Sequence, residues 1–359
     1  MNPDAGGAEV HLHEIMRRAV LSGHEVVQVS HAVPGLPEDE VLDGIRILRH
    51  GGRLTFNIGL RRFCDRLDLS SFDLIVEDLC KLPFFAPRWS KTPVAVLVPH
   101  LFGTTAYREV AFPLAFYVNA LEAFIPKVYS GCRFVAISGS TKADLVRRGI
   151  PAESVDVVPC GIDTSFYTPD ASENPEPGSI LYVGRVKKYK GIQNLVEAVR
   201  ILGQRGCKAR LRIVGTGDYL EPLKAMVRRS GSSGSVEFTG FVPAERKLLE
   251  LRRAWVAALP SEKEGWGLTV IEANACGTPV VASDSDGLRD SVRNGETGLL
   301  VPHGRPEALA DALQSILQDP ARRERLAAGG LAWARTFTWD KAASDTIAAL
   351  QRAALQGHP

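Results

Sequence analysis

Short apolar runs rich in β-branched residues alternate with longer segments of helical composition along the first half of the chain. The runs predict strands at 25–30, 45–50, 73–77, 93–99, 134–137 and 155–159. Helices are predicted at 8–22, 58–67, 109–129 and 141–148. Strands that alternate with helices predict a mostly parallel sheet covered by helices on both faces, and hence an α/β fold.

The same alternation starts again after residue 178. Residues 169–178 hold three prolines and no β-branched or aromatic side chain, which predicts a linker. Beyond it, strands are predicted at 179–183, 211–214, 236–240, 256–259, 280–283 and 298–301, with helices at 192–202 and from 306 onward. We therefore predict an N-terminal α/β domain (1–168), the linker (169–178), a C-terminal α/β domain (179–335) and a C-terminal helix (336–359) that packs back on the N-terminal domain.

Composition and charge restrict the classes of function. Hydrophobic residues make up 45% of the 359 residues and charged residues 23%, as in an ordinary globular protein. The net charge of +2, without a long basic run, argues against nucleic acid as the main partner. The six cysteines have no metal-ligand spacing and are typical of reduced thiols. With no signal peptide and no apolar window of membrane-spanning length, we expect a cytoplasmic protein.

The stretch 264–282 carries most of the candidate chemistry and is expected to form a loop, helix, turn and strand. Gly265 and Gly267 open the helix, where free backbone N–H groups and the helix dipole suit a phosphate. Glu264 and Glu272 lie eight residues apart, just over two helical turns, so both can face one ligand. Carboxylates accept hydrogen bonds from sugar hydroxyls, so the stretch suits a nucleotide sugar. A solvated helix face is the alternative.

A second basic, glycine-bounded loop follows the predicted strand 179–183. It runs from Gly184 to Gly191 and contains Arg185 and Lys190. Arginine can grip a diphosphate with two hydrogen bonds while lysine acts as a point charge. The loop does not follow the Walker pattern, and a solvated basic loop is the alternative.

Two candidates lie in the N-terminal half. His100 ends the apolar strand 93–99, and ligands of open α/β sheets lie beyond the carboxyl ends of strands. A packed, hydrogen-bonded histidine is the alternative. Gly6 and Gly7 open the first helix and form a further candidate phosphate cradle. In a βα unit such a turn follows an apolar strand, which this sequence lacks before Gly6. We expect the first strand of the N-terminal sheet to be missing, through a mis-chosen start or an artefact, and the chain to have low stability.

Two charged segments have competing interpretations. Six arginines and one acid lie between residues 46 and 66. A basic surface helix explains them, and the alternative is contact with an anionic acceptor or with lipid headgroups at the inner face of the membrane. Asp284 and Asp286 form a DxD pattern like a metal site, but in a Ser/Gly-rich turn after a strand such residues usually cap backbone groups. No metal is therefore expected.

Several short motifs occur in a fixed order: GGAE at 6–9, VAIS at 135–138, VPCGID at 158–163, VGR at 183–185 with KG at 190–191, the pair Glu264 and Glu272, ACGTPV at 275–280 and GETGLLV at 295–301. In this order and spacing the chain resembles glycosyltransferase family 4, whose members are retaining enzymes of GT-B fold that use nucleotide-sugar donors. The resemblance covers almost the whole chain. It implies two Rossmann-like domains whose parallel sheets face a central cleft.

The resemblance also implies an activity: transfer of a hexosyl group from a nucleotide-diphosphate sugar, such as a UDP- or GDP-hexose, to a hydroxyl of a glycan, lipid-linked or small-molecule acceptor. A front-face mechanism without a metal or other cofactor is implied. The catalytic residues would be His100, Arg185, Lys190 and Glu264. The residues that bind the donor would be Gly6, Gly7, Gly184, Arg185, Lys190, Glu264, Gly265, Trp266, Gly267, Leu268 and Glu272.

The chain departs from the family pattern at a few positions. Trp266 stands where the family usually has phenylalanine, Ser285-Asp286-Gly287 replaces a glycine pair, and Asp290 replaces glutamate, so the donor contacts there are open. A nucleotide-sugar epimerase of GT-B fold and a non-catalytic nucleotide-sugar-binding protein are the alternatives. A phosphorylase would need a pyridoxal-binding lysine and a far longer chain.

Overall fold

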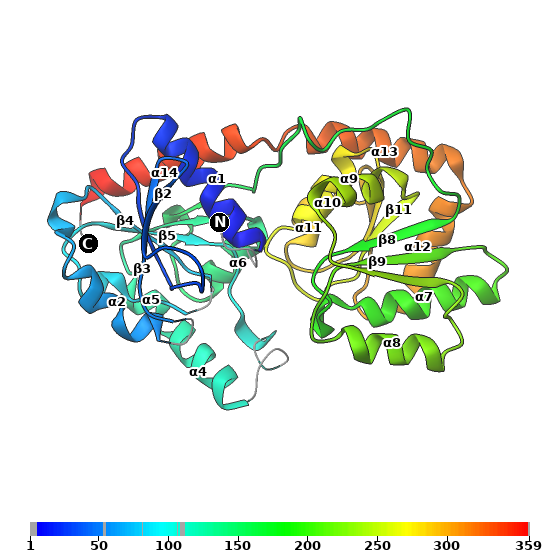
Figure 1. The fold of residues 1–359 in the computed structure, drawn as a ribbon, viewed down its shortest axis with the longest axis horizontal. Helices are drawn as coiled ribbons and strands as arrows, with labels where there is room; N and C mark the ends of the chain where they lie inside the picture. The colour runs from blue at the N-terminus through cyan, green and yellow to red at the C-terminus, as the bar shows by residue number, and fades with distance from the viewer. Residues whose placement is uncertain (1–5, 53–54, 81, 106, 108–111, 358–359) are drawn as a thin grey trace. The chain divides into compact units, whose positions relative to one another are not determined.

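A computed structural model describes residues 6–52, 55–80, 82–105, 107 and 112–357 (Figure 1). Contacts between residues divide the chain into two compact units. Unit 1 comprises Met1–Gly103, Pro113–Gly161 and Trp339–Pro359, and unit 2 comprises Thr104–Phe112 and Ile162–Thr338. The chain thus ends in the unit in which it begins.

Unit 1 contains two sheets. The larger sheet is parallel and has the order β4 (Ile75–Asp78), β5 (Val94–Val98), β6 (Arg133–Ala136), β7 (Val155–Val157). The smaller sheet has the order β1 (Val27–Ser30), β3 (Ile45–Arg49), β2 (Asp39–Leu42). In it β1 is parallel to β3, whereas β2 is antiparallel. β2 was not predicted from the sequence, although Asp43-Gly44 between β2 and β3 is a typical two-residue hairpin turn.

In the described part of the chain, β1 and β4 each lie at the edge of a unit 1 sheet. Within the described part of the chain, β1 pairs only with β3, and β4 pairs only with β5. Each therefore presents a row of backbone groups at a sheet edge. The first strand, which the sequence led us to expect to be missing, would lie before Gly6 and thus outside the described residues.

The helices of unit 1 pack around these sheets. They are α1 (Gly7–Leu21), α2 (Phe56–Cys64), α4 (Phe112–Ala123), α5 (Ile125–Val128), α6 (Gly139–Arg147) and α14 (Trp339–Gln356), with short 3-10 turns at Leu69–Ser71, Ala86–Arg88 and Ala152–Ser154. A further 3-10 turn, Gly103–Thr105, lies where the chain passes from unit 1 to unit 2. The predicted helix 109–129 is interrupted at Phe124, just before Pro126, because proline cannot donate the helical hydrogen bond. Residues 109–111 of that prediction lie outside the described residues.

The last helix belongs to unit 1. α14 contacts α1, β5 and β6. The Nε atom of Arg18 on α1 donates to Oδ1 of Asp340 at 2.6 Å, and the ring centroids of His11 and Trp339 are 5.9 Å apart. The core on the sheet includes Val96, Phe134, Tyr129, Ile125 and Leu145, all fully buried.

Unit 2 is built on one fully parallel sheet. Its order is β10 (Val236–Gly240), β9 (Arg210–Val214), β8 (Ser179–Val183), β11 (Val256–Leu259), β12 (Val280–Ser283), β13 (Gly298–Val301). Its helices are α7 (Ile192–Gln204), α8 (Leu220–Arg229), α9 (Ala244–Arg253), α10 (Leu268–Ala275), α11 (Leu288–Ser291), α12 (Pro306–Leu317) and α13 (Pro320–Ala334), with a 3-10 turn at Lys188–Lys190. β11 and β12 are buried along their whole length, which explains their uninterrupted apolar sequences.

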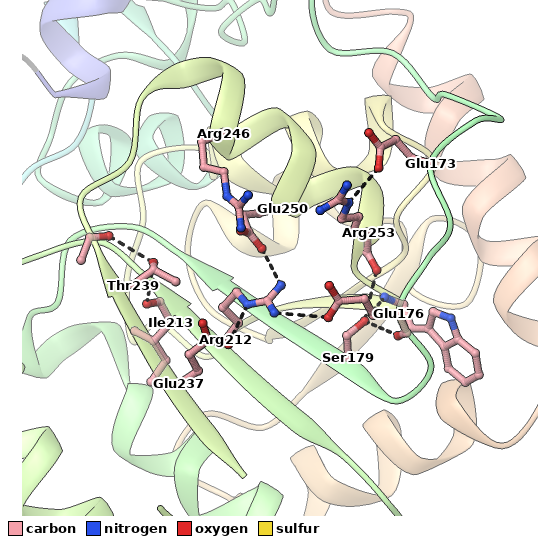
Figure 2. Close-up of polar contacts among 12 residues, drawn as sticks. Glu173, Glu176, Ser179, Arg212, Ile213, Glu237, Thr239, Arg246, Glu250 and Arg253 are labelled. Carbon is pink, nitrogen blue, oxygen red and sulfur yellow. Dashed lines mark hydrogen bonds and ion pairs between the residues drawn. The ribbon is translucent and has the colours of Figure 1, made fainter. Parts of the chain in front are cut away.

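The predicted linker 169–178 lies against unit 2. Its acidic side chains pair with arginines: Arg253 with Glu173 at 2.7 Å and Arg212 with Glu176 at 3.3 Å (Figure 2). The backbone N–H of Glu176 also donates to the carbonyl oxygen of Arg253, at 2.8 Å. The change from unit 1 to unit 2 comes earlier, between residues 161 and 162.

Candidate functional site

The order of the unit 2 sheet reverses between β8 and β11. From β8 the chain proceeds outward through β9 and β10, then returns to β11 on the other side and proceeds through β12 and β13. At such a point the loops that leave the two central strands diverge, and ligands of open α/β sheets bind beyond the strand ends there. The loops after β8 and β11 contain Arg185, Lys190 and Glu264, three of the four predicted catalytic residues.

Gly191 brings the two loops together. It closes the loop after β8 and precedes α7, with φ of +68°, a conformation that favours glycine. A Cβ atom at this position would collide with the carbonyl oxygen of Pro260, directly after β11. Only glycine therefore lets the loop after β8 approach the segment after β11 this closely.

Lys190 and Glu264 form the central contact of the site. Their Nζ and Oε1 atoms are 2.5 Å apart, and the two side chains are 15% and 17% exposed. Lys190 also lies over the ring of Tyr189, with Nζ 5.0 Å from the centroid. Burial lowers the pKa of Lys190, but the charge of Glu264 and the contact with Tyr189 outweigh it, so the net pKa is raised. The lysine thus carries its positive charge over the physiological pH range.

The other basic side chains of this loop are more exposed. Arg185 and Lys188 are exposed to solvent, while Lys187 pairs with Asp218 at 2.5 Å. The carbonyl oxygen of Arg185 accepts a hydrogen bond from the buried Tyr182 hydroxyl at 2.9 Å, which fixes the backbone where the loop leaves β8. Arg185 is therefore anchored through its backbone, and its guanidinium is accessible to a ligand.

The N-terminus of α10 lies beside Glu264. Gly267 precedes the first helical residue, Leu268, as predicted. The N–H of Glu264 donates to the carbonyl oxygen of Asp286 at 3.0 Å. Gly287 has φ of +79°, and a Cβ atom there would collide with the carbonyl oxygen of Glu264, so the turn 285–287 fits closely against the loop.

The Trp266 side chain is buried within unit 2. Its side chain is only 4% exposed and packs edge-on against Phe337 at 5.1 Å between centroids. Its predicted contribution to donor binding can therefore come only from its backbone, next to Gly265 and Gly267.

Glu272 lies on α10 and has partners that the sequence analysis missed. Its Oε2 atom is 2.6 Å from Nζ of Lys247 on α9. Lys247 also lies over the ring of Tyr167, 5.4 Å from the centroid. Burial, followed by the charge of Glu272 and a hydrogen bond to it, raises the pKa of Tyr167. No sequence motif marks either partner. Lys247 is one of several charged residues on an amphipathic helix, and Tyr167 lies in a loop segment.

The remaining predicted residues, His100, Gly6 and Gly7, belong to unit 1. His100 follows β5, is half-buried and lies 5.2 Å from the ring of Phe102. The N–H of Gly6 donates to Glu9 Oε2 at 2.9 Å, so a carboxylate already occupies part of the predicted phosphate cradle. The Glu9 carboxylate also affects Asp78, at the end of β4. Burial, followed by the charges of Glu9 and Glu77, raises the pKa of Asp78 to about 7.

The DxD residues pair with an arginine. Arg289 is 2.6 Å from Asp284 and 3.6 Å from Asp286. Over the described ranges, no group of three or more His, Cys, Asp or Glu side chains is placed to hold a metal ion. None of the helices described above is long and apolar enough to cross a membrane.

Comparison with known proteins assigns the family. Residues 164–333 match the family model "Glycosyl transferases group 1", and residues 5–166 match the model "Glycosyltransferase Family 4". The chain belongs to glycosyltransferase family 4. The resemblance inferred from the motifs is thereby confirmed.

Two curated relatives that match the chain carry the same name. The proteins named "D-inositol 3-phosphate glycosyltransferase" from Jonesia denitrificans and Rhodococcus erythropolis are 37% and 36% identical to this chain over 221 and 222 residues. These matches cover 56% and 58% of the chain and 52% and 50% of the relatives. The chain thus spans about half the length of the curated relatives it matches.

Solved structures confirm the fold class. A sucrose-phosphate synthase from Thermosynechococcus elongatus is 25% identical, with a TM-score of 0.82 over 97% of this chain and 93% of that one. HepE from Anabaena, in complex with UDP-glucose, is 19% identical, with a TM-score of 0.76 over 99% and 96%. The predicted α/β architecture, a GT-B fold with two Rossmann-like domains, is therefore confirmed.

Proposed function

We propose that this family 4 member is a retaining glycosyltransferase that moves a hexosyl group from a nucleotide-diphosphate sugar to an acceptor hydroxyl without a metal. The Lys190–Glu264 pair at the switch point of unit 2 is the observation that carries the proposal. It puts a cation suited to a diphosphate next to a carboxylate suited to sugar hydroxyls, at the N-terminus of α10. The curated relatives named as glycosyltransferases and the UDP-glucose complex of HepE support this choice of donor.

In the proposed reaction, the bond between the anomeric carbon and the diphosphate oxygen breaks. The bond from that carbon to the acceptor oxygen forms on the same face of the sugar, and the acceptor proton passes to the leaving diphosphate. Negative charge develops on the diphosphate, so Arg185 and Lys190 would stabilise it, together with the N–H groups at Gly265–Leu268. Glu264 would accept hydrogen bonds from the transferred sugar and Glu272 from the ribose.

Unit 1 would supply the remaining contacts. His100 would face the reacting sugar, and the glycine pair Gly6-Gly7 would approach the diphosphate. Because Glu9 occupies the N–H of Gly6 in this structure, donor binding there requires the Glu9 carboxylate to move away. The acceptor would be a glycan, a lipid-linked molecule or a small polyol. The name of the curated relatives makes inositol phosphate the first acceptor to test.

We also propose that the protein is cytoplasmic and contacts the inner face of the membrane peripherally. Two of the arginines between 46 and 66 have internal partners: Arg46 pairs with Asp39, and the buried Arg49 pairs with Glu40. In contrast, three side chains on or just after α2 are exposed, namely Arg61, Arg62 and Arg66. They offer positive charge to anionic headgroups.

Exposed aromatic side chains on α4 support the same contact. Phe112 is 71% exposed and Phe116 59% exposed, and α4 has no exposed charged residue. An apolar helix that is exposed on a protein surface usually has a partner, and aromatic side chains favour the membrane interface. The double change Arg61→Gln and Arg62→Gln should lower sedimentation with phosphatidylglycerol vesicles and leave the low sedimentation with phosphatidylcholine unchanged. Equal sedimentation of wild type and variant would contradict the contact.

The donor site is tested by thermal stabilisation with UDP-, GDP- and ADP-sugars. A donor that binds only the folded state raises the melting temperature by mass action. We expect one donor to stabilise the wild type, and Glu264→Ala and Lys190→Ala to respond weakly. Lys224→Ala, which removes the exposed Lys224–Glu221 pair, is the control and should respond like the wild type. If no donor stabilises the wild type, the donor proposal fails.

Catalysis is tested with the donor that binds. Release of nucleoside diphosphate that depends on the acceptor, with an unchanged anomeric configuration in the product, is the expected result. A sugar altered without any acceptor would indicate the epimerase instead. Donor binding with no turnover on any acceptor would indicate the non-catalytic binding protein.

A further inference from the structure

The two glutamates of the 264–272 stretch have the same kind of surroundings. Lys190 pairs with Glu264 at 2.5 Å and lies over the Tyr189 ring. Lys247 pairs with Glu272 at 2.6 Å and lies over the Tyr167 ring. Each glutamate thus pairs with one lysine, each lysine lies over a tyrosine ring, and the two lysines come from different elements of unit 2.

The second of these clusters is nearly enclosed. Glu272 is 9% exposed as a residue, and the Lys247 side chain is 23% exposed. A carboxylate in such surroundings must be paired or it loses its charge, because desolvation disfavours the ionised form. Lys247 supplies that charge, and it also offsets the repulsion that an unpaired Glu272 would exert on a bound diphosphate.

We propose that Lys247 and Tyr167 are positioning residues that hold the Glu272 carboxylate for the ribose of the donor. The proposal rests on the proposed function, in which Glu272 accepts hydrogen bonds from the ribose hydroxyls. The ion pair engages Oε2 of Glu272 and the Tyr167 hydroxyl bonds to the same carboxylate. A carboxylate has about four acceptor positions, so acceptor capacity remains for a ligand hydroxyl. Held in one orientation, this group distinguishes a ribose from a deoxyribose.

The competing interpretation is that the Lys247–Glu272 pair only joins α9 to α10, which are in contact. A purely structural pair would alter the stability of the protein but not the preference for ribose over deoxyribose. The decisive quantity is therefore the ratio of two dissociation constants in the same variant.

The experiment measures binding of UDP, GDP and ADP and of their 2′-deoxy counterparts by calorimetry. For the diphosphate that binds, we expect the wild type to prefer the ribose form by about tenfold or more, as for a hydrogen bond to a charged group. Lys247→Met and Tyr167→Phe should reduce this preference severalfold, whereas Lys247→Arg, which keeps the cation, should largely retain it. Lys224→Met, which breaks the exposed Lys224–Glu221 pair, is the control and should leave it unchanged.

The outcomes separate this proposal from the proposed function. If Lys247→Met and Tyr167→Phe bind more weakly but keep the wild-type preference, the pair is structural and the positioning role is wrong. The same holds if the wild type binds both forms equally. If Lys247→Met does not fold, the measurement on Tyr167→Phe decides. If the wild type binds none of the diphosphates, the proposed function fails, and the ribose inference fails with it.

Discussion

The ion pair between Arg212 on β9 and Glu250 on α9 allows a quantitative test of how unit 2 is held together (Figure 2). The Glu250 side chain is only 1% exposed, and its carboxylate lies 2.7 Å from Arg212 and 2.7 Å from Arg246. Arg212 also contacts Glu237 and Glu176, whose side chains are 62% and 44% exposed. Glu250 is thus the one fully enclosed charge among these five residues.

Arg212→Met removes the less exposed of the two arginines that pair with Glu250. Breaking a buried pair by removing one partner costs about 3–5 kcal/mol, because the remaining charge stays desolvated. Arg246 remains, but its side chain is 50% exposed, so it compensates only in part and we expect a loss of about 2–3 kcal/mol. The exposed contacts with Glu237 and Glu176 add less than about 1 kcal/mol.

A double-mutant cycle tests this reasoning by urea unfolding followed by circular dichroism. Glu250→Leu should also destabilise unit 2, but the double variant Arg212→Met, Glu250→Leu should lose less than the sum of the two single losses, because no buried charge is left unpaired. The matched control Arg200→Met breaks the Glu197–Arg200 pair, whose side chains are one-third exposed, and should cost less than about 1 kcal/mol. Additive losses in the double variant, or a loss at Arg212 no larger than at Arg200, would refute the argument.

Three further variants test other parts of the chain by thermal unfolding. Gly191→Ala should cost about 1–3 kcal/mol and weaken nucleoside-diphosphate binding, because φ of +68° is strained for alanine and its Cβ would meet the Pro260 carbonyl; unchanged values would contradict this. Burial lowers the pKa of His11 from 6.5 to about 4. The contribution of neutral His11 to folding stability is therefore fully present above pH 6.5 and is lost as the pH falls toward 4. His11→Phe should make the melting temperature depend less on pH over this range. Burial and nearby carboxylates raise the pKa of Asp78 from 3.8 to about 7, so its contribution is present below pH 3.8 and lost as the pH rises through 7. The melting temperature of Asp78→Asn relative to that of the wild type should therefore be higher at pH 8 than at pH 5. The same difference in melting temperature at both pH values would contradict the raised pKa of Asp78.

Sequence patterns predicted the fold well where strands are buried on both faces. In unit 2, the predicted strands 256–259, 280–283 and 298–301 coincide with β11 to β13, since runs of apolar residues bounded by turns have few other interpretations. The pattern failed at β2, whose alternating exposed and half-buried residues carry charges. The prediction for residues 169–178 was incomplete. Their proline content predicted a linker but could not show that arginines distant in the sequence bind it.

Some residues of the candidate site could likewise be predicted from the sequence, and others could not. Residues with a local motif, such as Glu264, Gly267 and Lys190, could be selected from the sequence because their neighbours along the chain mark them. Lys247 and Tyr167 could not, because they join Glu272 only through tertiary packing of α9 and of the segment after residue 162 against α10. The inward orientation of Trp266 was likewise invisible, since it depends on Phe337 near the far end of unit 2.

The close backbone approaches at Gly191 and Gly287 bear on attempts to redesign the loops around Lys190 and Glu264. Both glycines lie against carbonyl oxygens of the segment 260–264, so the spacing of the loops around Lys190 and Glu264 is set by main chain against main chain. Libraries that randomise these loops should keep both glycines, because any side chain there would separate the loops before it could alter selectivity. The exposed Lys188 has no assigned role in the proposed reaction and can vary without moving that framework, which makes it a better position for variation.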